Sequence, residues 1–139
     1  MSEAAAIAII TKCINKTKHV LLIYRNTEPY KNYWALPGGK INFKEAAKDA
    51  VIREIREEVD LDFEPILYYT YYERIPDKNI DGDVYVYEGN AKGEPRLSKN
   101  EITKFGWFSI QNSTKMNLAF SHNEILNNYL KNKKRSFQK

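Results

Sequence analysis

The feature that most constrains the fold is a charged segment with the pattern of a half-buried helix. Between Ala47 and Val59, apolar residues recur at the spacing of one face of an α-helix, which turns roughly 100° per residue. Two acidic residues, Glu54 and Glu58, fall on that same face one turn apart. The segment therefore predicts a helix that carries two carboxylates toward the protein interior.

Two interpretations of these carboxylates are open. Charged helical segments are most often solvated, but the apolar neighbours of Glu54 and Glu58 place both side chains toward the protein. Like charges one turn apart repel each other by about 0.2–0.5 kcal/mol, and when partly buried they need a compensating cation or a proton. Clustered carboxylate oxygens suit a hard divalent ion, so we favour a metal site over a solvated helix face.

The same stretch resembles the signature of the Nudix hydrolase family, G-x5-E-x7-R-E-U-x-E-E-x-G-U, in which U is aliphatic. The residues that match in register are Gly39, Glu45, Arg53, Glu54, Ile55, Glu57, Glu58 and Leu61. The sole departure is Asp60, where the family has the glycine that ends the helix. Aspartate tolerates a left-handed backbone at a cost of about 1–2 kcal/mol, so this departure affects the helix end rather than the chemistry.

Length and composition indicate the class of protein. The 139 residues predict one domain, residues 1–139, and the net charge of +4 suits an anionic partner such as a nucleotide. The sequence has no broad basic stripe, so nucleic acid is unlikely as a partner. Cys13 stands alone, which excludes an internal disulfide and fits a reducing cytoplasm. The apolar run Ala4–Ile10 is far shorter than the roughly 20 residues of a membrane span, so we expect neither a membrane anchor nor a signal peptide.

The rest of the chain predicts strands around the charged helix. The expected strands are Ala4–Thr11, His19–Arg25, Asp62–Tyr72 and Val84–Tyr87, and Ile102–Ser109 is expected as a strand or a turn. A loop is expected at Pro76–Gly82, and capping boxes are expected at Asn42 with Glu45 and at Ser121 with Glu124, the latter opening a last helix. This order predicts an α/β (α+β) fold, and the family resemblance sharpens it to a Nudix-type α-β-α sandwich with a mixed central sheet.

The resemblance also implies a hydrolase that acts on phosphorus-containing anhydrides with Mg²⁺ or Mn²⁺. Glu54 and Glu58 are the first candidates for metal ligands, Glu57 is the third, and the carbonyl of Gly38 matches a main-chain ligand of the family. Gly39 belongs to the Pro-Gly-Gly turn, where the backbone can approach a substrate closely.

The remaining candidate site residues are open to more than one role. Arg53 matches an orienting arginine of the family, and for Glu45 we favour a cap or an ion pair over metal ligation. Arg25, at a strand end, could reach a phosphate or lie exposed. The general base is open between a signature residue, Glu57, and a residue of a later loop, for which Glu101 is the main candidate. The loop candidates are Glu101, Glu94 and Glu88, although Glu101 could equally be a surface carboxylate. His122 is interpreted as structural.

Features outside the signature divide between two substrate classes. Pro76 and the segment Leu118–Leu126 resemble the ADP-ribose pyrophosphatase branch of the family, whereas Asn100-Glu101 partly resembles the branch that hydrolyses oxidised purine triphosphates. We favour an ADP-ribose-like substrate over a nucleoside triphosphate. A non-catalytic nucleotide-binding module and an enzyme that processes RNA ends are less favoured functions. Many relatives are dimers, so by analogy a homodimer is expected.

Overall fold

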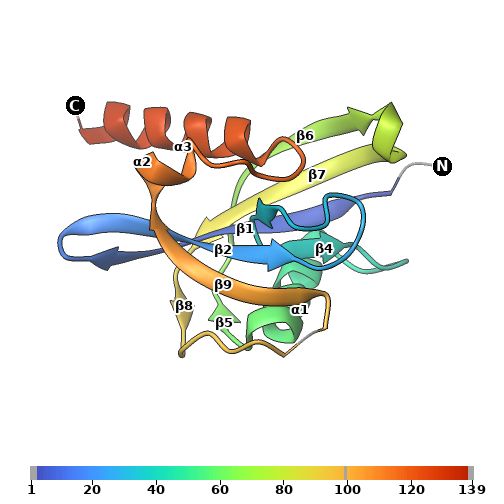
Figure 1. Ribbon diagram of the computed structural model, residues 1–139, viewed down its shortest axis with the longest axis horizontal. Helices are drawn as coiled ribbons and strands as arrows, with labels where there is room; N and C mark the ends of the chain where they lie inside the picture. The colour runs from blue at the N-terminus through green and yellow to red at the C-terminus, as the bar shows by residue number, and fades with distance from the viewer. Residues whose placement is uncertain (1–2, 99, 138–139) are drawn as a thin grey trace.

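The computed structural model describes residues 3–98 and 100–137, which form a mixed sheet between helices (Figure 1). The longer strands are β1 Ala5–Ile14, β2 Thr17–Arg25, β6 Ile66–Ile75, β7 Ile80–Gly89 and β9 Ile102–Ser109. The shorter strands are β3 Trp34–Ala35, β4 Gly38–Lys40, β5 Asp62–Phe63 and β8 Ala91–Lys92. The helices are α1 Ala47–Val59, α2 Ile110–Ser113, α3 His122–Phe137 and the 3₁₀ turn η1 Pro76–Lys78. No helix within the described ranges is long and apolar enough to cross a membrane.

Strand β1 lies at the centre of the sheet, and its two edges have different partners. One edge runs parallel to β7, whose far side pairs antiparallel with β6. The other edge is shared, because β2 pairs with the end of β1 and β4 pairs with its start, both antiparallel. Strand β9 extends the sheet beyond β2, and β5 pairs with β8 in a separate small sheet. The sheet is therefore mixed, as predicted.

The chain between β2 and α1 bridges the fork where β2 leaves β1. Strand β3 pairs with β2, whereas β4 pairs with β1, and the turn between them is held by a hydrogen bond from the Ala8 N–H to the Pro37 carbonyl at 2.9 Å. Gly38 follows with φ +144°, and a Cβ there would lie 2.3 Å from the Ala6 carbonyl oxygen. Only glycine fits this contact, so the turn lies directly against the central strand.

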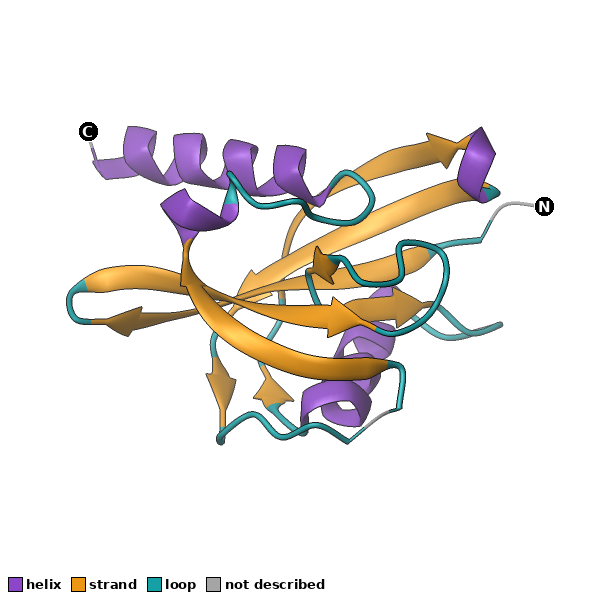
Figure 2. Cartoon of the chain, in the orientation of Figure 1, coloured by secondary structure: helices purple, strands orange, loops and turns teal. Residues whose placement is uncertain are grey.

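Helices α1 and α3 lie on opposite faces of the sheet (Figures 1 and 2), and an apolar core fills the space under each of them. Ala6, Ala8 and Ile10 of β1 belong to the core under α1, and Ile7 and Ile9 belong to the core under α3. A strand buried on both faces explains the continuous apolar run near the N-terminus. The arrangement confirms the predicted α-β-α sandwich.

The predicted loop Pro76–Gly82 is wrong. Strands β6 and β7 remain paired as far as Ile75 and Ile80, and η1 closes the hairpin between them. Asn79 adopts a left-handed conformation, φ 57° and ψ 39°, and its N–H donates to the Pro76 carbonyl. Proline and glycine in this stretch therefore belong to a tight turn and to the first residues of β7, rather than to a long loop.

The two capping boxes form only in part, although a helix does begin directly after Ser121 as predicted. Helix α1 begins after Ala46, which makes no side-chain cap, although Glu45 does accept the N–H of Asn42 in the preceding turn at 3.0 Å. At the start of α3, the N–H of Ser121 donates to Glu73 at 3.1 Å. The box required that N–H to bond Glu124, so a contact distant in sequence has replaced a local one.

Candidate functional site

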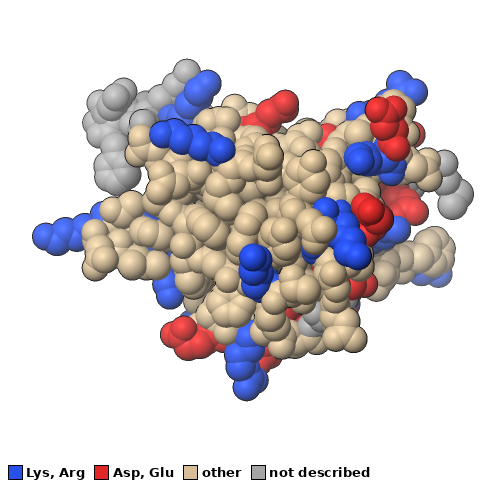
Figure 3. All heavy atoms as spheres, viewed as in Figure 1, with Lys and Arg blue, Asp and Glu red and all other residues tan. Residues whose placement is uncertain are grey.

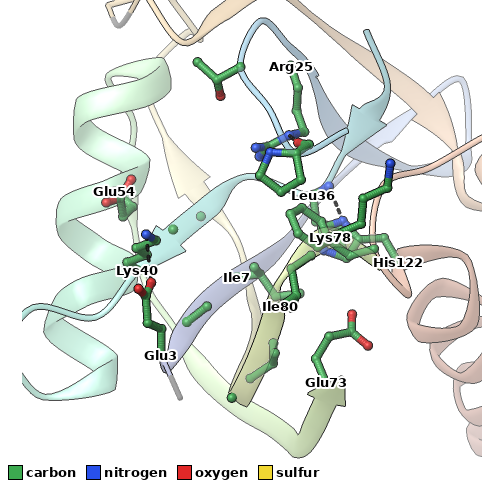
Figure 4. Close-up of a pocket in the computed structure, with 18 of the residues that line it drawn as sticks. Glu3, Ile7, Arg25, Leu36, Lys40, Glu54, Glu73, Lys78, Ile80 and His122 are labelled. Atoms are coloured by element: carbon green, nitrogen blue, oxygen red, sulfur yellow. Dashed lines mark hydrogen bonds and ion pairs between the residues drawn. The ribbon is translucent and has the colours of Figure 1, made fainter. Parts of the chain in front are cut away.

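A cavity of about 690 Å³ opens at the fork of the sheet (Figure 4). Its walls come from β1, β2, the Pro-Gly-Gly turn, α1, the β6–β7 hairpin and the start of α3. This volume lies within the roughly 300–1,000 Å³ that is usual for small-molecule sites. The predicted site residues that line it are Arg25, Gly38, Gly39, Glu54, Glu58 and Glu101.

The carboxylate pair of α1 is buried, as its position on the apolar face predicts. Glu54 is 6% exposed and Glu58 is 5% exposed. Glu58 Oε1 accepts the N–H of Gly38 at 2.9 Å. The Glu54 carboxylate lies against Gly39, where a Cβ would come within 2.6 Å of its carboxyl carbon. The two glycines therefore let α1 press both acids against the turn.

Arg53 joins the carboxylates along α1. Its Nε and Nη2 donate to Glu45 at 2.8 and 2.9 Å, and its Nη1 donates to Glu54 at 2.9 Å and to Glu57 at 2.6 Å. The bonds from Arg53, together with the N–H of Asn42, lower the pKa of Glu45 to about 2. The same carboxylates, Glu45 foremost, raise the pKa of Arg53. The ion pair expected of Glu45 is therefore present, and Arg53 fixes the direction of the acidic side chains.

Glu57 lies apart from the other acids of the signature. Its side chain is 42% exposed, and it is not one of the described residues that line the cavity. Its carboxylate nevertheless shares the Nη1 of Arg53 with Glu54. On a helix that turns roughly 100° per residue, Glu57 falls at the border of the apolar face, and its partial exposure agrees with that position.

Arg25 brings a positive charge to the wall of the cavity, across from Glu54 (Figure 4). Its Nε donates to the Pro29 carbonyl at 3.0 Å, and its guanidinium lies 5.1 Å from the centre of the Phe120 ring. Burial lowers the pKa of Arg25, and the nearby charges of Glu58 and Glu101 oppose that shift. The strand-end arginine thus faces the cavity, in the field of two acids that also line it.

The cavity continues to a second polar region that the sequence did not reveal. Glu73, on β6, is 6% exposed and lines the wall. Its carboxylate accepts the N–H of Ser121 at 3.1 Å, the Oγ–H of Ser121 at 2.6 Å and the hydroxyl of Tyr71 at 3.3 Å. The available signal was an acidic residue in line with Tyr69 and Tyr71 on the inward face of an alternating strand.

His122 lies in this second region and is 3% exposed. Its Nδ1 accepts the N–H of Leu36 at 3.0 Å, so the neutral ring carries its proton on Nε2. Burial, reinforced by the charge of Arg25, lowers the pKa of His122 to about 3. The ring therefore supports the Pro-Gly-Gly turn, as a structural residue would, and also forms part of the wall.

Figure 3 shows how charge is distributed on one face of the molecule. Basic and acidic side chains gather together at the end that carries the β6–β7 hairpin, and the middle of this face is mostly uncharged. No patch of one sign covers the described part of this face. The positive charge at the cavity therefore comes from individual residues that line it, such as Arg25.

Residues 2–129 match the family described as NUDIX domain. The chain belongs to the Nudix family. It is 31% identical over 121 residues to an ADP-ribose pyrophosphatase of Methanocaldococcus jannaschii, covering 85% of this chain and 69% of that protein. It is 26% identical to an ADPR responsive transcriptional repressor of Acinetobacter baylyi, covering 77% of this chain but only 44% of the repressor.

The structural comparison agrees with the sequence match. The NUDIX domain of Shewanella oneidensis NrtR, solved in complex with ADP ribose, superposes with a TM-score of 0.85 over 95% of this chain and 88% of that one. At 18% identity this likeness shows the fold alone. The family match and the similarity to a pyrophosphatase show that the chain is a Nudix hydrolase.

Nudix hydrolases generally use divalent metal ions. Across residues 3–98 and 100–137, no three acidic, histidine or cysteine side chains converge into a ready-made metal site. Mg²⁺ is usually held by one or two carboxylates together with water and substrate phosphates. The two buried carboxylates, Glu54 and Glu58, therefore fit such an ion by their chemistry and their number.

Proposed function

We propose that this Nudix hydrolase cleaves the pyrophosphate bond of a nucleoside diphosphate joined to a second group, with ADP-ribose as the first candidate. The observation that carries the proposal is that one cavity joins the carboxylates of α1 to the second polar region at Glu73 and His122. A substrate with a bulky group on each side of a pyrophosphate needs room beyond the phosphates. The name of the M. jannaschii relative supports the same substrate.

We further propose Mg²⁺ or Mn²⁺ as the cofactor, held by Glu54 and Glu58, with Glu57 and the carbonyl of Gly38 as additional ligands. When bound, such an ion supplies positive charge to the phosphates and acidifies water. The bond from the Gly38 N–H to Glu58 supports this assignment, because it fixes one carboxylate against the residue whose carbonyl is proposed as a ligand. Arg53 keeps the acid side chains oriented from the other side of α1.

The protein's own residues then divide the remaining work. Arg25 contacts a phosphate oxygen and offsets its charge, and Gly39 lets the substrate approach the turn. A water attacks one phosphorus, and Glu101 or Glu57 accepts its proton. The bond from that phosphorus to the bridging oxygen breaks, and the second phosphate leaves with the electron pair. Glu101 is the stronger candidate for the base because it lines the cavity.

A hydrolysis screen with Mg²⁺ and with Mn²⁺ tests the proposal. We expect kcat/KM for ADP-ribose to exceed that for any nucleoside triphosphate by about tenfold or more, or about 1.4 kcal/mol. We expect Glu101→Gln to lower kcat for every substrate alike, as the loss of a base would.

Two outcomes would contradict this. If triphosphates are preferred and Glu101→Gln alters purine preference while sparing kcat, the enzyme belongs with the oxidised-purine triphosphatases. If ADP-ribose binds without turnover under either metal, the chain acts as a nucleotide-binding module, as the A. baylyi relative's name would suggest.

A cytoplasmic location and a homodimer also stay proposals. The lone Cys13 is exposed, which suits a reducing compartment. Sedimentation of the purified chain would measure its oligomeric state directly.

A further inference from the structure

The second polar region of the cavity carries two buried groups of opposite hydrogen-bonding character. The carboxylate of Glu73 is an acceptor with about four lone-pair positions, and the donors on it are Ser121, through its N–H and Oγ–H, and the hydroxyl of Tyr71. Among the described residues, the Oγ–H of Ser121 is the one donor on Oε2, so this oxygen can accept a further hydrogen bond. His122 offers a donor, Nε2–H, because its Nδ1 is taken by the N–H of Leu36.

This region lies next to the proposed phosphate contact. The guanidinium of Arg25 is 5.1 Å from the centre of the Phe120 ring, and that ring is 5.3 Å from the ring of His122. Figure 4 shows Glu73 and Glu54 on opposite sides of the cavity. The second region therefore lies where it would contact a part of the substrate that is close to the phosphate bound by Arg25 and distant from the carboxylates of α1.

We propose that Glu73 and His122 form a subsite for the vicinal hydroxyls of a ribose. A hydroxyl can donate to Glu73 while its neighbour accepts from the Nε2–H of His122, so a diol matches the acceptor–donor pair. Phosphate does not suit Glu73, because both carry negative charge. A purine edge also pairs a donor with an acceptor, but the group bonded next to the pyrophosphate is the sugar. The inference rests on the proposed pyrophosphohydrolase function and applies to any ribonucleotide that the site accepts.

The test removes one hydroxyl at a time from the ligand. Calorimetry with the full chain would compare ADP-ribose with two analogues, one lacking the 2′-hydroxyl of the adenosine ribose and one lacking that of the terminal ribose. The wild type should bind one of them roughly 10- to 100-fold more weakly, the range for a hydrogen bond to a charged group. The analogue that binds more weakly identifies which ribose occupies the subsite.

Variants then show whether Glu73 accepts a hydrogen bond from that hydroxyl. In Glu73→Gln the preference for the hydroxyl should shrink to a fewfold, and KM should rise while kcat changes little. His122→Asn should reduce the preference as well, because asparagine can still accept the Leu36 N–H but lacks the donor at Nε2. Glu124→Gln is the matched control, since Glu124 opens the same helix but lines a separate small groove with Tyr69. It should keep the full preference.

Three results would overturn the subsite. The first is a wild type that binds the parent nucleotide and both analogues equally. The second is Glu73→Gln with lowered thermal stability and unchanged preference, which would make Glu73 only a support for α3. The third is sensitivity to loss of the purine 6-amino group in place of the hydroxyl.

The test of the subsite can be told apart from the test of the proposed function. If ADP-ribose is not a substrate, the same comparison is made with ATP and dATP, or with whichever nucleotide pair the screen identifies. If Glu73→Gln does not fold, the wild-type hydroxyl preference and its response to His122→Asn decide the question.

Discussion

Replacing Glu58 with glutamine is the sharpest test of the proposed metal site. Glu58 is 5% exposed, and its Oε1 accepts the N–H of Gly38 at 2.9 Å. Glutamine has nearly the same shape, so its amide oxygen can keep that hydrogen bond. The second oxygen becomes an NH₂ group, which donates hydrogen bonds and does not bind a cation. The substitution therefore removes one charge and one ligand atom but keeps the contact between α1 and the turn.

The expected effect on catalysis is large, and the effect on folding is small. Loss of one preorganised electrostatic group costs about 2.7–4 kcal/mol, so kcat should fall by about 10²–10³-fold. A neutral hydrogen bond contributes about 1 kcal/mol less to folding than a charge-assisted one. Relief of the repulsion between Glu54 and Glu58 recovers about 0.2–0.5 kcal/mol. The net loss of under about 1 kcal/mol corresponds to a Tm change of no more than about 5 °C.

The assay measures kcat with the best substrate of the screen, and Tm with and without Mg²⁺. The wild type should gain Tm with the metal, and Glu58→Gln should gain less, because a ligand stabilises only a state that binds it. Glu64→Gln is the matched control, since its carboxylate pairs with Lys92 at 3.5 Å outside the cavity wall. Near-wild-type kcat in both Glu54→Gln and Glu58→Gln would refute the metal assignment.

Three further changes test the surroundings of α1. Asp60→Gly should keep kcat and leave Tm equal or slightly higher, because Asp60 sits at φ 56° and ψ 43°, where glycine is unstrained; a large fall in kcat at unchanged Tm would place Asp60 in the site. Gly39→Ala should lower kcat by about tenfold or more in steady-state assays, because the new Cβ would displace the Glu54 carboxylate, and an unchanged kcat would contradict that contact. Glu45→Gln tests acid stability. The pKa of Glu45 is lowered from 4.5 to about 2, so its carboxylate stabilises the fold above pH 4.5 and loses that effect as the pH falls toward 2. In thermal unfolding across pH, the variant should melt below the wild type at neutral pH and the gap should close in acid; a gap independent of pH would exclude the ion pair as its cause.

The parts of the site that follow from local periodicity could be predicted from the sequence. Glu54 and Glu58 fall on the apolar face of α1 by angle alone, and both are buried in the structure. Asp60 ends the helix in the left-handed conformation that its place in the signature implied. Strand β9 has the predicted bounds, Ile102–Ser109, because a dense run of aromatic and β-branched residues marks it.

The parts that depend on distant contacts could not be predicted. Glu73 and Ser121 are 48 residues apart, and nothing near either residue indicates the other. Ser121 matches a local capping pattern, yet a buried carboxylate from β6 takes its N–H. The hairpin after β6 differs from the expected loop for a related reason: Asn79 closes a tight turn that proline and glycine alone do not distinguish from a loop.

The fork in the sheet explains why the two ends of the cavity differ in this way. Strand β2 pairs with β1 only from Thr11 to Ile14, and beyond that point the Pro-Gly-Gly turn bridges the gap and opens the cavity. The carboxylate end is therefore tied to the central strand, since Gly38 contacts β1 and also donates to Glu58. The far end is built from β6 and the start of α3, which lie outside the signature. The side chain at 73 contacts Ser121 and Tyr71 and can change without moving the turn's contact with α1, whereas His122 also holds the turn through the Leu36 N–H. On the proposed function, substrate choice can therefore vary at 73 apart from bond cleavage, but not at 122.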